Sequence, residues 1–444
     1  MKISKPKPIE ELFNRSWDKS QILSLGKYKP TDEKGRYLHW HKIKYKYSRE
    51  AELAWLGTKL SRAALLSPLQ IGSEVFSYAT PKSLLSLLHF IDKTTGGSIG
   101  ASNLAGLGKV EQSAFLLKSL IMEEAISSAQ LEGASTTRKV AKEMLRSERK
   151  PKTKDEIMIV NNYLLMKEAL ALKDSPLTPE MILAMHRTAT NNAIENNAVS
   201  GQFRSDDEIH IADYDGNIIH QPPKHTEISE LIQALCDFAN TSHSGEGGDF
   251  IHPVIKAIIL HFLIGYIHPF GDGNGRTARA IFYWYMLKSG YWLFEYVSIS
   301  RLLKVAPAKY ARAFIYTETD DLDMTYFIYH QAETIKRAIL ELESYINNKQ
   351  RNFKAFSRAI VAFTTKKQVK FNRRQIQILQ KAVKESGAIF TAKEVSNELG
   401  ISENTARSDL NALLNFELLG VIKSGRAIFY IAPNDLIERL KHSN

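Results

Sequence analysis

The segment HPFGDGNGRTAR, residues 268–279, determines how the whole chain is interpreted. It holds three glycines within five positions, Gly271, Gly273 and Gly275, which let the backbone adopt positive φ and approach a ligand closely. The apolar pattern that follows, RTARAIFYWYMLKS, predicts a helix that begins where this loop ends. The free N–H groups and the positive dipole end of that helix would face whatever the loop holds, so the segment predicts an anion site.

The side chains of the same segment suit phosphate chemistry. Arg276 and Arg279 are three residues apart on the first helical turn, where guanidinium groups grip phosphate oxygens through paired hydrogen bonds. Asp272 offers a hard oxygen ligand for Mg²⁺, and Asn274 adds an amide donor. His268 has the one side chain there that titrates near neutrality, which makes it the candidate general base. Together these residues indicate phosphoryl or nucleotidyl transfer. The alternative is an ordinary glycine-rich turn in which Arg279 forms a structural salt bridge.

HPFGDGNGRTAR resembles the signature of the Fic family, HxFx[D/E]GNGRxxR, and matches it at every defined position. The likeness covers roughly residues 100–300 and implies a mainly α fold, in which a helical Fic core carries a β-hairpin flap. It also implies transfer of AMP from ATP to a protein hydroxyl, with Mg²⁺ as the cofactor. The related Doc branch, which transfers phosphate, has Lys where this chain has Gly275, so the resemblance favours nucleotidyl transfer.

The resemblance also implies a role for each residue of the signature. His268 would deprotonate the target hydroxyl, and Asp272 would hold Mg²⁺ on the α- and β-phosphates. Arg276 would contact the triphosphate, and Arg279 would contact its γ-phosphate. The ATP-binding loop, with its anion hole at the last three positions, would consist of Gly271, Gly273, Asn274 and Gly275.

A second segment, SAQLEG at residues 128–133, resembles the inhibitory pattern [S/T]xxxE[G/N] of the same family. Its place before the signature implies a class II protein, which is autoinhibited from its N-terminal side. Ser128 and Glu132 lie on one face near the end of a predicted helix that stops at Gly133. A carboxylate is unfavourable at that end of the helix dipole, so we expect Glu132 to pair with a cation, Arg279. The alternative is an exposed glutamate before a capping glycine.

The segment GQFRSDDEIHIADYDGNIIHQPP, residues 201–223, interrupts the helical pattern upstream of the signature, where the family has its flap. Asp215 and Gly216 form a two-residue hairpin signal. The exposed edge of the hairpin would align an extended target segment by strand addition. The alternative is an ordinary solvent-exposed hairpin. The flap residues that we expect are Phe203, Ile209 and Ile211.

Composition excludes several classes of protein. The 444 residues are 44% hydrophobic and 24% charged, which rules out wholesale disorder. The start, MKISKPKPIE, lacks the apolar stretch of a secretory signal, and no apolar run reaches the length of a membrane span. The single cysteine, Cys236, excludes an intrachain disulfide and a cysteine-based zinc site. We therefore expect a cytoplasmic protein without membrane contact.

The net charge of +11 is concentrated at the two ends of the chain. Residues 1–50 hold 13 Lys and Arg against 6 Asp and Glu, and residues 349–444 hold 17 against 8. Such a basic run is usually a solvated surface, but it is also typical of a module that binds a polyanion. The predicted organisation is an N-terminal region, a Fic core with the inhibitory helix, and a C-terminal domain, at residues 1–110, 111–350 and 351–444.

The last hundred residues predict a winged helix-turn-helix domain, from the order helix, strand, helix, turn, helix and two-stranded wing. The outward positions of the second helix of the motif and the wing would contact DNA. The residues that we single out for this role are Asn404, Thr405, Arg407, Ser408, Lys423 and Arg426. The alternative is a protein–protein or dimerisation module, because the helix also carries Glu403 and Asp409.

Elsewhere the sequence predicts helices, with three exceptions. GRYLHWHKIKYKY, residues 35–47, predicts one or two short strands, and GGSIGASNLAGLG, residues 96–108, predicts a loop. Residues 201–223 predict the one hairpin of the body. His261 with His268 and Asp272 would suit a metal hydrolase, but a histidine within an apolar helix is more often packed and hydrogen-bonded.

The sequence as a whole predicts an autoinhibited protein adenylyltransferase that uses ATP. The expected partners are a target protein with a hydroxyl acceptor, DNA through the C-terminal domain, and a second copy of the chain in a homodimer. Two alternatives stay open. One is a DNA-binding regulator whose Fic core senses nucleotide, and the other is an enzyme that removes AMP or transfers another phosphate-containing group.

Overall fold

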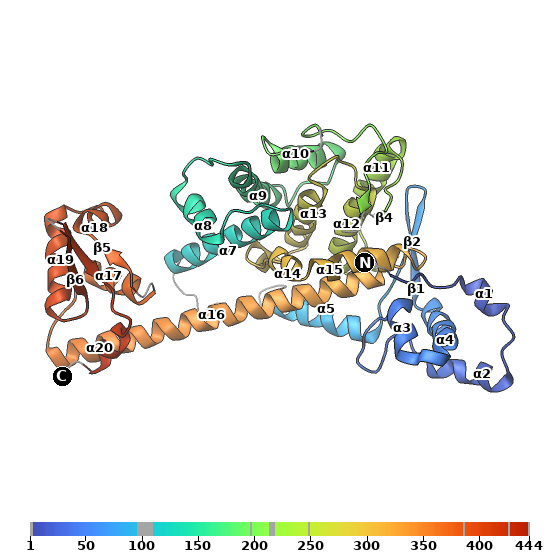
Figure 1. The fold of residues 1–444 in the computed structure, drawn as a ribbon, viewed down its shortest axis with the longest axis horizontal. Coiled ribbons are helices and arrows are strands. Elements are labelled where there is room, and N and C mark those ends of the chain that lie inside the picture. The colour runs from blue at the N-terminus through green and yellow to red at the C-terminus, as the bar shows by residue number, and fades with distance from the viewer. Residues whose placement is uncertain are drawn as a thin grey trace. The chain divides into compact units, whose positions relative to one another are not determined.

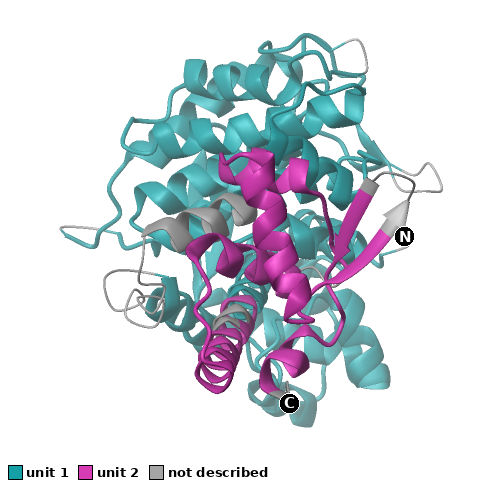
Figure 2. Ribbon diagram, turned by 90° about the vertical axis from the view of Figure 1, so that its left-hand side faces the viewer, with its two compact units in different colours: residues 1–342 teal, residues 343–444 magenta. Residues whose placement is uncertain are grey.

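The chain folds into two compact units, which comprise residues 1–342 and 343–444 (Figure 2). Helices dominate both, in agreement with the predicted mainly α fold. The computed structural model describes residues 3–95, 110–195, 198–212, 218–246, 249–384, 387–424 and 427–442. The segment 96–108, predicted as a loop, and the predicted turn at Asp215 and Gly216 lie outside the described residues.

α12 (Pro253–Ile267) is the central helix of the first unit, and α13 (Asn274–Lys288) packs along it (Figure 1). All side chains from Val254 to Ile264 are buried. A helix that is apolar on every side is stable only when other elements surround it. Four further helices of this body lie where helices were predicted: α7 (Val110–Leu131), α9 (Lys154–Ala171), α10 (Pro179–Thr190) and α11 (Ile228–Asn240).

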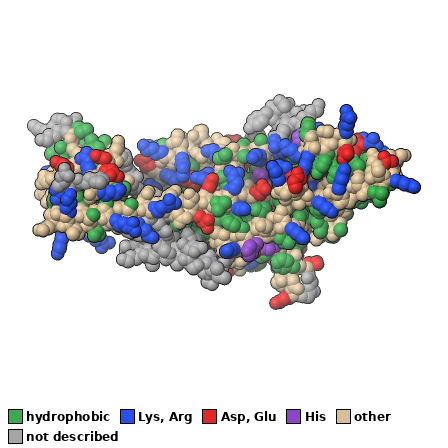
Figure 3. Space-filling model, turned by 90° about the horizontal axis from the view of Figure 1, so that it is seen from below, with side chains coloured by type: hydrophobic (Ala, Val, Ile, Leu, Met, Phe, Trp, Pro, Cys, Tyr) green, Lys and Arg blue, Asp and Glu red, His purple; other side chains and the backbone are tan. Residues whose placement is uncertain are grey.

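Five further described helices of the first unit lie after residue 80 in the sequence. They are α5 (Lys82–Thr95), α8 (Arg138–Ser147), α14 (Ser300–Val305), α15 (Pro307–Glu318) and α16 (Thr325–Lys367). Helix α16 continues beyond residue 342 into the second unit. Within the described residues no helix combines the length and the apolar character needed to cross a lipid bilayer. Lys and Arg side chains are scattered among apolar ones over the face drawn in Figure 3.

The first sixty residues form helices, and the prediction of strands over residues 35–47 is wrong. Helix α3 covers most of that segment, and the His39 side chain caps it by accepting a hydrogen bond from the backbone N–H of His41, at 3.1 Å. Ile43 is buried between this helix and α4. The alternation of aromatic and basic residues imitates a strand, but packing against α4 decides the outcome. The helices here are α1 (Ile9–Phe13), α2 (Lys19–Ser24), α3 (Trp40–Tyr47) and α4 (Ala51–Ala63).

A β-hairpin that the sequence analysis missed follows α4, so the described part of the body has two hairpins and not one. Strands β1 (Leu66–Ile71) and β2 (Glu74–Ala79) pair in antiparallel register, and Gly72 takes a positive φ in the turn between them. The predicted helix therefore ends at Ala63 and does not reach residue 66. Phe76 of β2 is buried and its ring packs edge-on against Phe262 of α12, which explains why this segment forms a strand on the core.

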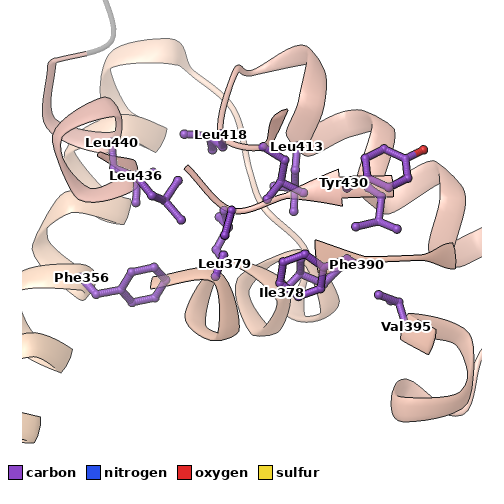
Figure 4. Close-up of a cluster of buried hydrophobic side chains, with 14 of the residues drawn as sticks. Phe356, Ile378, Leu379, Phe390, Val395, Leu413, Leu418, Tyr430, Leu436 and Leu440 are labelled. Atoms are coloured by element: carbon purple, nitrogen blue, oxygen red, sulfur yellow. The ribbon is translucent and has the colours of Figure 1, made fainter. Parts of the chain in front are cut away.

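The second unit contains the elements that the sequence predicted, in the predicted order, and ends in an additional helix. They are α17 (Arg373–Lys384), β5 (Ile389–Phe390), α18 (Ala392–Leu399), α19 (Glu403–Asn415), β6 (Gly420–Ser424), β7 (Ala427–Ile431) and α20 (Leu436–His442). The strands form one sheet in the order β5-β7-β6. Phe356 of α16, Leu379, Leu413, Tyr430 and Leu440 belong to one buried cluster, so the unit has its own hydrophobic core (Figure 4).

Candidate active site

His268 ends α12 in the left-handed conformation, with φ 47°, and begins the signature loop. Its Nδ1 lies 3.2 Å from the backbone oxygen of Gly265. Because a carbonyl oxygen only accepts hydrogen bonds, Nδ1 must carry the proton in this contact. The tautomer that results leaves a lone pair on Nε2, which is the nitrogen needed to take a proton from a substrate.

Burial lowers the pKa of the His268 imidazole to about 4, although the Gly265 carbonyl and the Glu132 carboxylate act in the opposite direction. The side chain is therefore neutral at physiological pH. A neutral imidazole with a defined tautomer is a proton acceptor, which is the form that a general base requires.

Asn274 and Phe270 give the signature loop its shape. The Asn274 side chain accepts a hydrogen bond from the N–H of Phe270, at 3.0 Å, and donates one to the oxygen of the same residue, at 2.7 Å. The amide that the sequence predicted as a ligand donor is thus engaged with the loop itself. Phe270 is fully buried, which anchors the loop in the core.

His186 of α10 contacts the signature loop, and the sequence analysis did not identify it. Its ring stacks on Phe270, with the ring centroids 3.7 Å apart, and its Nε2 donates to the backbone oxygen of Asp272 at 2.8 Å. The N–H of Gly201 donates to Nδ1 at 2.9 Å, which fixes the tautomer. Burial lowers the pKa of His186 to about 4. At Gly273, where φ is 84°, a Cβ atom would meet Thr190 and the His186 ring, so this approach requires glycine.

Arg276 and Asp272 form an ion pair at 2.9 Å on the side of the loop that faces α10. Arg276 is fully buried and also donates to the backbone oxygen of Ala189 at 2.8 Å. The second carboxylate oxygen of Asp272 accepts from the N–H of Glu195 at 3.0 Å. The structure thus turns Arg276 toward α10, whereas Arg279 points elsewhere, and the two guanidinium groups do not share a partner among their described contacts.

Arg279 contacts the end of α7, which is 147 residues away in sequence. It donates to the Glu132 carboxylate at 2.8 Å and to the Ser128 hydroxyl at 3.0 Å. The ion pair expected between Glu132 and Arg279 is therefore present. Burial disfavours the charge of Arg279, but the Glu132 carboxylate offsets this effect, so the pKa of the guanidinium is raised. Gly133 follows with φ 101°, as a helix stop requires.

The Glu132 carboxylate also lies over the start of α13. A Cβ atom at Gly275 would meet the Glu132 carboxylate and the Arg279 guanidinium before any other group. The first turn of a helix has N–H groups without intrahelical acceptors, and an anion is stabilised there. Glu132 therefore occupies the position at which the sequence predicted an anion site.

An acidic residue within α7, Glu124, fixes this helix in the core. Its carboxylate is buried and accepts hydrogen bonds from the Ser298 hydroxyl, at 2.7 Å, and from the N–H of Ser300, at 3.1 Å. Ser300 is the first residue of α14, so Glu124 caps that helix.

The predicted flap is a short hairpin of β3 (Ile211–Ala212) and β4 (Ile218–His220). Of the three predicted flap residues, Ile211 begins β3 and Ile209 precedes it, whereas Phe203 packs against Phe270 of the signature loop, with ring centroids 5.4 Å apart.

Arg204, which the sequence analysis missed, connects the base of the flap to the signature loop. It donates to the backbone oxygen of His268 at 3.0 Å and to that of Pro223, which follows the hairpin. Its own N–H donates to Pro269 at 2.9 Å. The residue thus holds both ends of the flap segment next to the histidine.

His261 is buried in α12, and its Nε2 pairs with the Tyr310 hydroxyl at 2.9 Å. The interpretation as a packed and hydrogen-bonded histidine is confirmed. Across the described residues, no group of three or more His, Cys, Asp or Glu side chains is placed to hold a metal ion by itself.

In the second unit, Asn404, Arg407 and Ser408 are exposed on α19, and Thr405 is half-buried and pairs with the Ser402 hydroxyl at 2.8 Å. Arg407 forms an exposed ion pair with Glu403 at 2.9 Å. Arg426 and the side chain of Lys423 lie outside the described residues.

Comparison with known proteins agrees with this site. The Fic/DOC family model matches residues 176–286, which contain the flap and the signature loop but not Glu132. The protein adenylyltransferase Fic of Drosophila virilis is 30% identical over 132 residues, which cover 30% of this chain and 23% of that protein. Its Drosophila melanogaster counterpart is 29% identical over the same length and coverage. The match thus spans less than a quarter of these relatives.

A solved structure shares the fold over most of the chain. It is a Fic family protein from Desulfovibrio desulfuricans G20, with 17% identity and a TM-score of 0.50, and the alignment covers 79% of this chain and 96% of that protein. Taken together, a central apolar helix, the HPFGDGNGRTAR loop and this likeness define the class: the chain contains a Fic/DOC family domain.

Proposed function

We propose that this chain is a protein adenylyltransferase, which transfers AMP from ATP to the hydroxyl of a Tyr, Thr or Ser side chain of a target protein or of itself. The observation that carries the proposal is the pairing of two groups around one loop. The neutral imidazole of His268 has an unprotonated nitrogen, Nε2, that can accept a proton. The start of α13 offers an anion site beside the guanidinium of Arg279. The name of the Drosophila relatives supports the same chemistry.

Each residue of the site has a role in the steps of the proposed transfer. The acceptor hydroxyl gives its proton to Nε2 of His268 while its oxygen bonds to the α-phosphorus of ATP. The bond from that phosphorus to pyrophosphate breaks, and pyrophosphate leaves with the electron pair. Gly265 holds the proton on Nδ1, which keeps Nε2 available. The N–H groups of the first turn of α13 and Arg279 would stabilise the phosphate charge.

Mg²⁺ is the cofactor that this proposal requires, and Asp272 fits the role of its ligand. Mg²⁺ is usually held by one or two carboxylates together with substrate phosphates. The two oxygens of Asp272 each accept one hydrogen bond, from Arg276 and from the N–H of Glu195, and each keeps a second lone pair. Bound Mg²⁺ would neutralise phosphate charge during the transfer.

Glu132 would inhibit this reaction by holding Arg279. A cation that is paired with the carboxylate is not available to the γ-phosphate, and the carboxylate would repel the incoming triphosphate. Incubation with ATP labelled at the α-phosphate tests the proposal: label on protein is expected, above all from the Glu132→Gly variant. Release of labelled AMP from a previously modified protein would instead support AMP removal, and no label in any product would contradict both.

For residues 343–444 we infer a winged-helix domain that binds duplex DNA. Asp409, which argued against this role in the sequence, is buried and pairs with Arg374 at 2.6 Å and Asn372 at 2.7 Å. Its negative charge therefore does not face a ligand of α19. The exposed side chains of that helix include Asn404, Arg407 and Ser408, which suit base edges and phosphates. The alternative remains a protein contact.

A further inference from the structure

His220, the last residue of β4, joins the flap to two helices of the core. Its Nε2 lies 2.8 Å from the backbone oxygen of Tyr266, and its Nδ1 lies 2.8 Å from a carboxylate oxygen of Glu318. The side chain is only 6% exposed. Tyr266 belongs to the last turn of α12, and Glu318 is the last residue of α15.

Both partners of His220 are acceptors in their ordinary states, since a carbonyl oxygen and a carboxylate only accept. The Tyr266 carbonyl therefore accepts from Nε2–H, and Nδ1 forms a charge-assisted hydrogen bond with the Glu318 carboxylate when the ring carries both protons. Such charge-assisted hydrogen bonds are stronger than neutral ones. The carbonyl of Tyr266 is also one of the groups that the end of a helix leaves without an intrahelical donor. His220 thus satisfies the helix end that carries the catalytic histidine two residues later.

The two ends of the flap are therefore held at backbone carbonyls two residues apart. Arg204, before the hairpin, binds the carbonyl of His268, and His220, at the end of β4, binds the carbonyl of Tyr266. We propose that His220 and Glu318 are positioning residues, which fix β4 at the place where an acceptor segment aligned on the flap presents its hydroxyl to His268. This inference rests on the proposed adenylyl transfer.

The positioning role predicts a specific change in products. Nucleotide would bind through the start of α13 and Arg279, away from His220. Loss of the His220 contacts with Tyr266 and Glu318 should therefore not alter the affinity for ATP. Transfer of AMP to water, which yields free AMP, needs no aligned protein segment. In a Glu132→Gly background, His220→Ala should therefore lower self-labelling about tenfold or more relative to AMP release, the effect expected for two lost hydrogen bonds.

Two further variants separate positioning from folding. Glu318→Gln should retain the normal ratio of self-labelling to AMP release, because its amide donates to Nδ1 of a neutral His220 while Nε2 still donates to Tyr266. The matched control is His252→Ala. His252 also pairs with a carboxylate, that of Asp92 at 2.9 Å, but at the start of α12. Its loss should leave the ratio unchanged.

Amide hydrogen exchange of the described flap strands gives a second measurement that does not need activity. Exchange at β3 and β4 should rise in His220→Ala and stay at the background level in Glu318→Gln and His252→Ala. Faster exchange with an unchanged product ratio would overturn the positioning role, and so would an unchanged exchange. If the Glu132→Gly protein itself forms neither product, the proposed function has failed, which is a different result.

Discussion

The carboxylate of Glu132 and the guanidinium of Arg279 form an ion pair at 2.8 Å over the first turn of α13, next to Gly275. Arg279 is buried and also donates to the hydroxyl and the backbone oxygen of Ser128, and Glu132 is the carboxylate with which it forms an ion pair. A nucleotide γ-phosphate would need the same cation. Under the proposed function, Glu132 at the end of α7 and the γ-phosphate of a nucleotide would therefore compete for Arg279.

Replacing Glu132 should increase the proposed transfer of AMP. Glu132→Gly removes the carboxylate without breaking a helix, because α7 ends at Leu131. We expect self-labelling from α-labelled ATP to rise about tenfold or more, since a charged hydrogen bond to Arg279 no longer competes with the phosphate.

Glu132→Gln is the control for that prediction, because it keeps the volume of the side chain and removes its charge. It should also increase labelling. Unchanged labelling in both variants would show that the ion pair does not inhibit, and a loss of activity would place Glu132 in the chemistry.

His268→Ala should abolish transfer while ATP still binds. The imidazole accepts the proton, whereas the phosphates contact other groups, so the expected loss is that of a general base, about 10²–10⁴-fold. The rate of labelling and the affinity for ATP, measured in the Glu132→Gly background, test this together. A rate within a few-fold of the parent would remove His268 from its role.

The pH dependence of kcat/KM should differ from that of an ordinary histidine. Because the pKa of His268 is lowered to about 4, its base form persists as the pH falls and is lost only near that value. Between pH 7.5 and 5 we expect little change, whereas a base with a pKa near 6.5 would lose about 30-fold. Circular dichroism over the same range controls for unfolding. A decline centred near pH 6.5 would show that His268 is not held in the neutral form.

DNA binding by the second unit should depend steeply on salt. Each neutralised phosphate releases condensed counterion, and loss of one phosphate contact lowers the slope of log K against log salt by about 1. Arg407→Ala in the full chain should lower this slope. Arg439→Ala is the control, because Arg439 also pairs with a nearby carboxylate, that of Asp435, but lies on α20, outside the helix and wing proposed to contact DNA. Equal slopes for both variants, or no retention of duplex DNA at low salt, would favour the protein-contact alternative.

The signature loop was predictable because its residue types lie close together in the sequence. Glycines, a histidine, an aspartate and two arginines lie within twelve residues and need no knowledge of the fold. The pairing of Glu132 with Arg279 was predictable because the segment resembles the inhibitory pattern and a carboxylate at a helix end benefits from a cation, whereas the contact of Ser128 with Arg279 was not predicted.

The residues that support the loop were not predictable. His186, Arg204 and His220 each bind a backbone oxygen far away in sequence, at Asp272, His268 and Tyr266. Backbone acceptors are present at every residue and leave no pattern of side chains. The helix α3 and the hairpin β1-β2 were missed for a related reason: contacts with α4 and α12 decide their structure, and the local alternation of residue types does not.

The anchoring of α7 by Glu124 limits how Glu132 can leave the site. Glu124 caps α14 from within the core, so a shift of α7 as a rigid body would uncap another helix and expose a buried carboxylate. The Glu132 side chain, by contrast, lies beyond the last turn of α7 and is 27% exposed. We therefore expect release by rotation of this one side chain, which occurs within nanoseconds for exposed residues, whereas collective helix shifts take microseconds or longer. A regulator would then act by trapping a rotamer of Glu132, and the backbone of the activated protein would superimpose on that of the inhibited one.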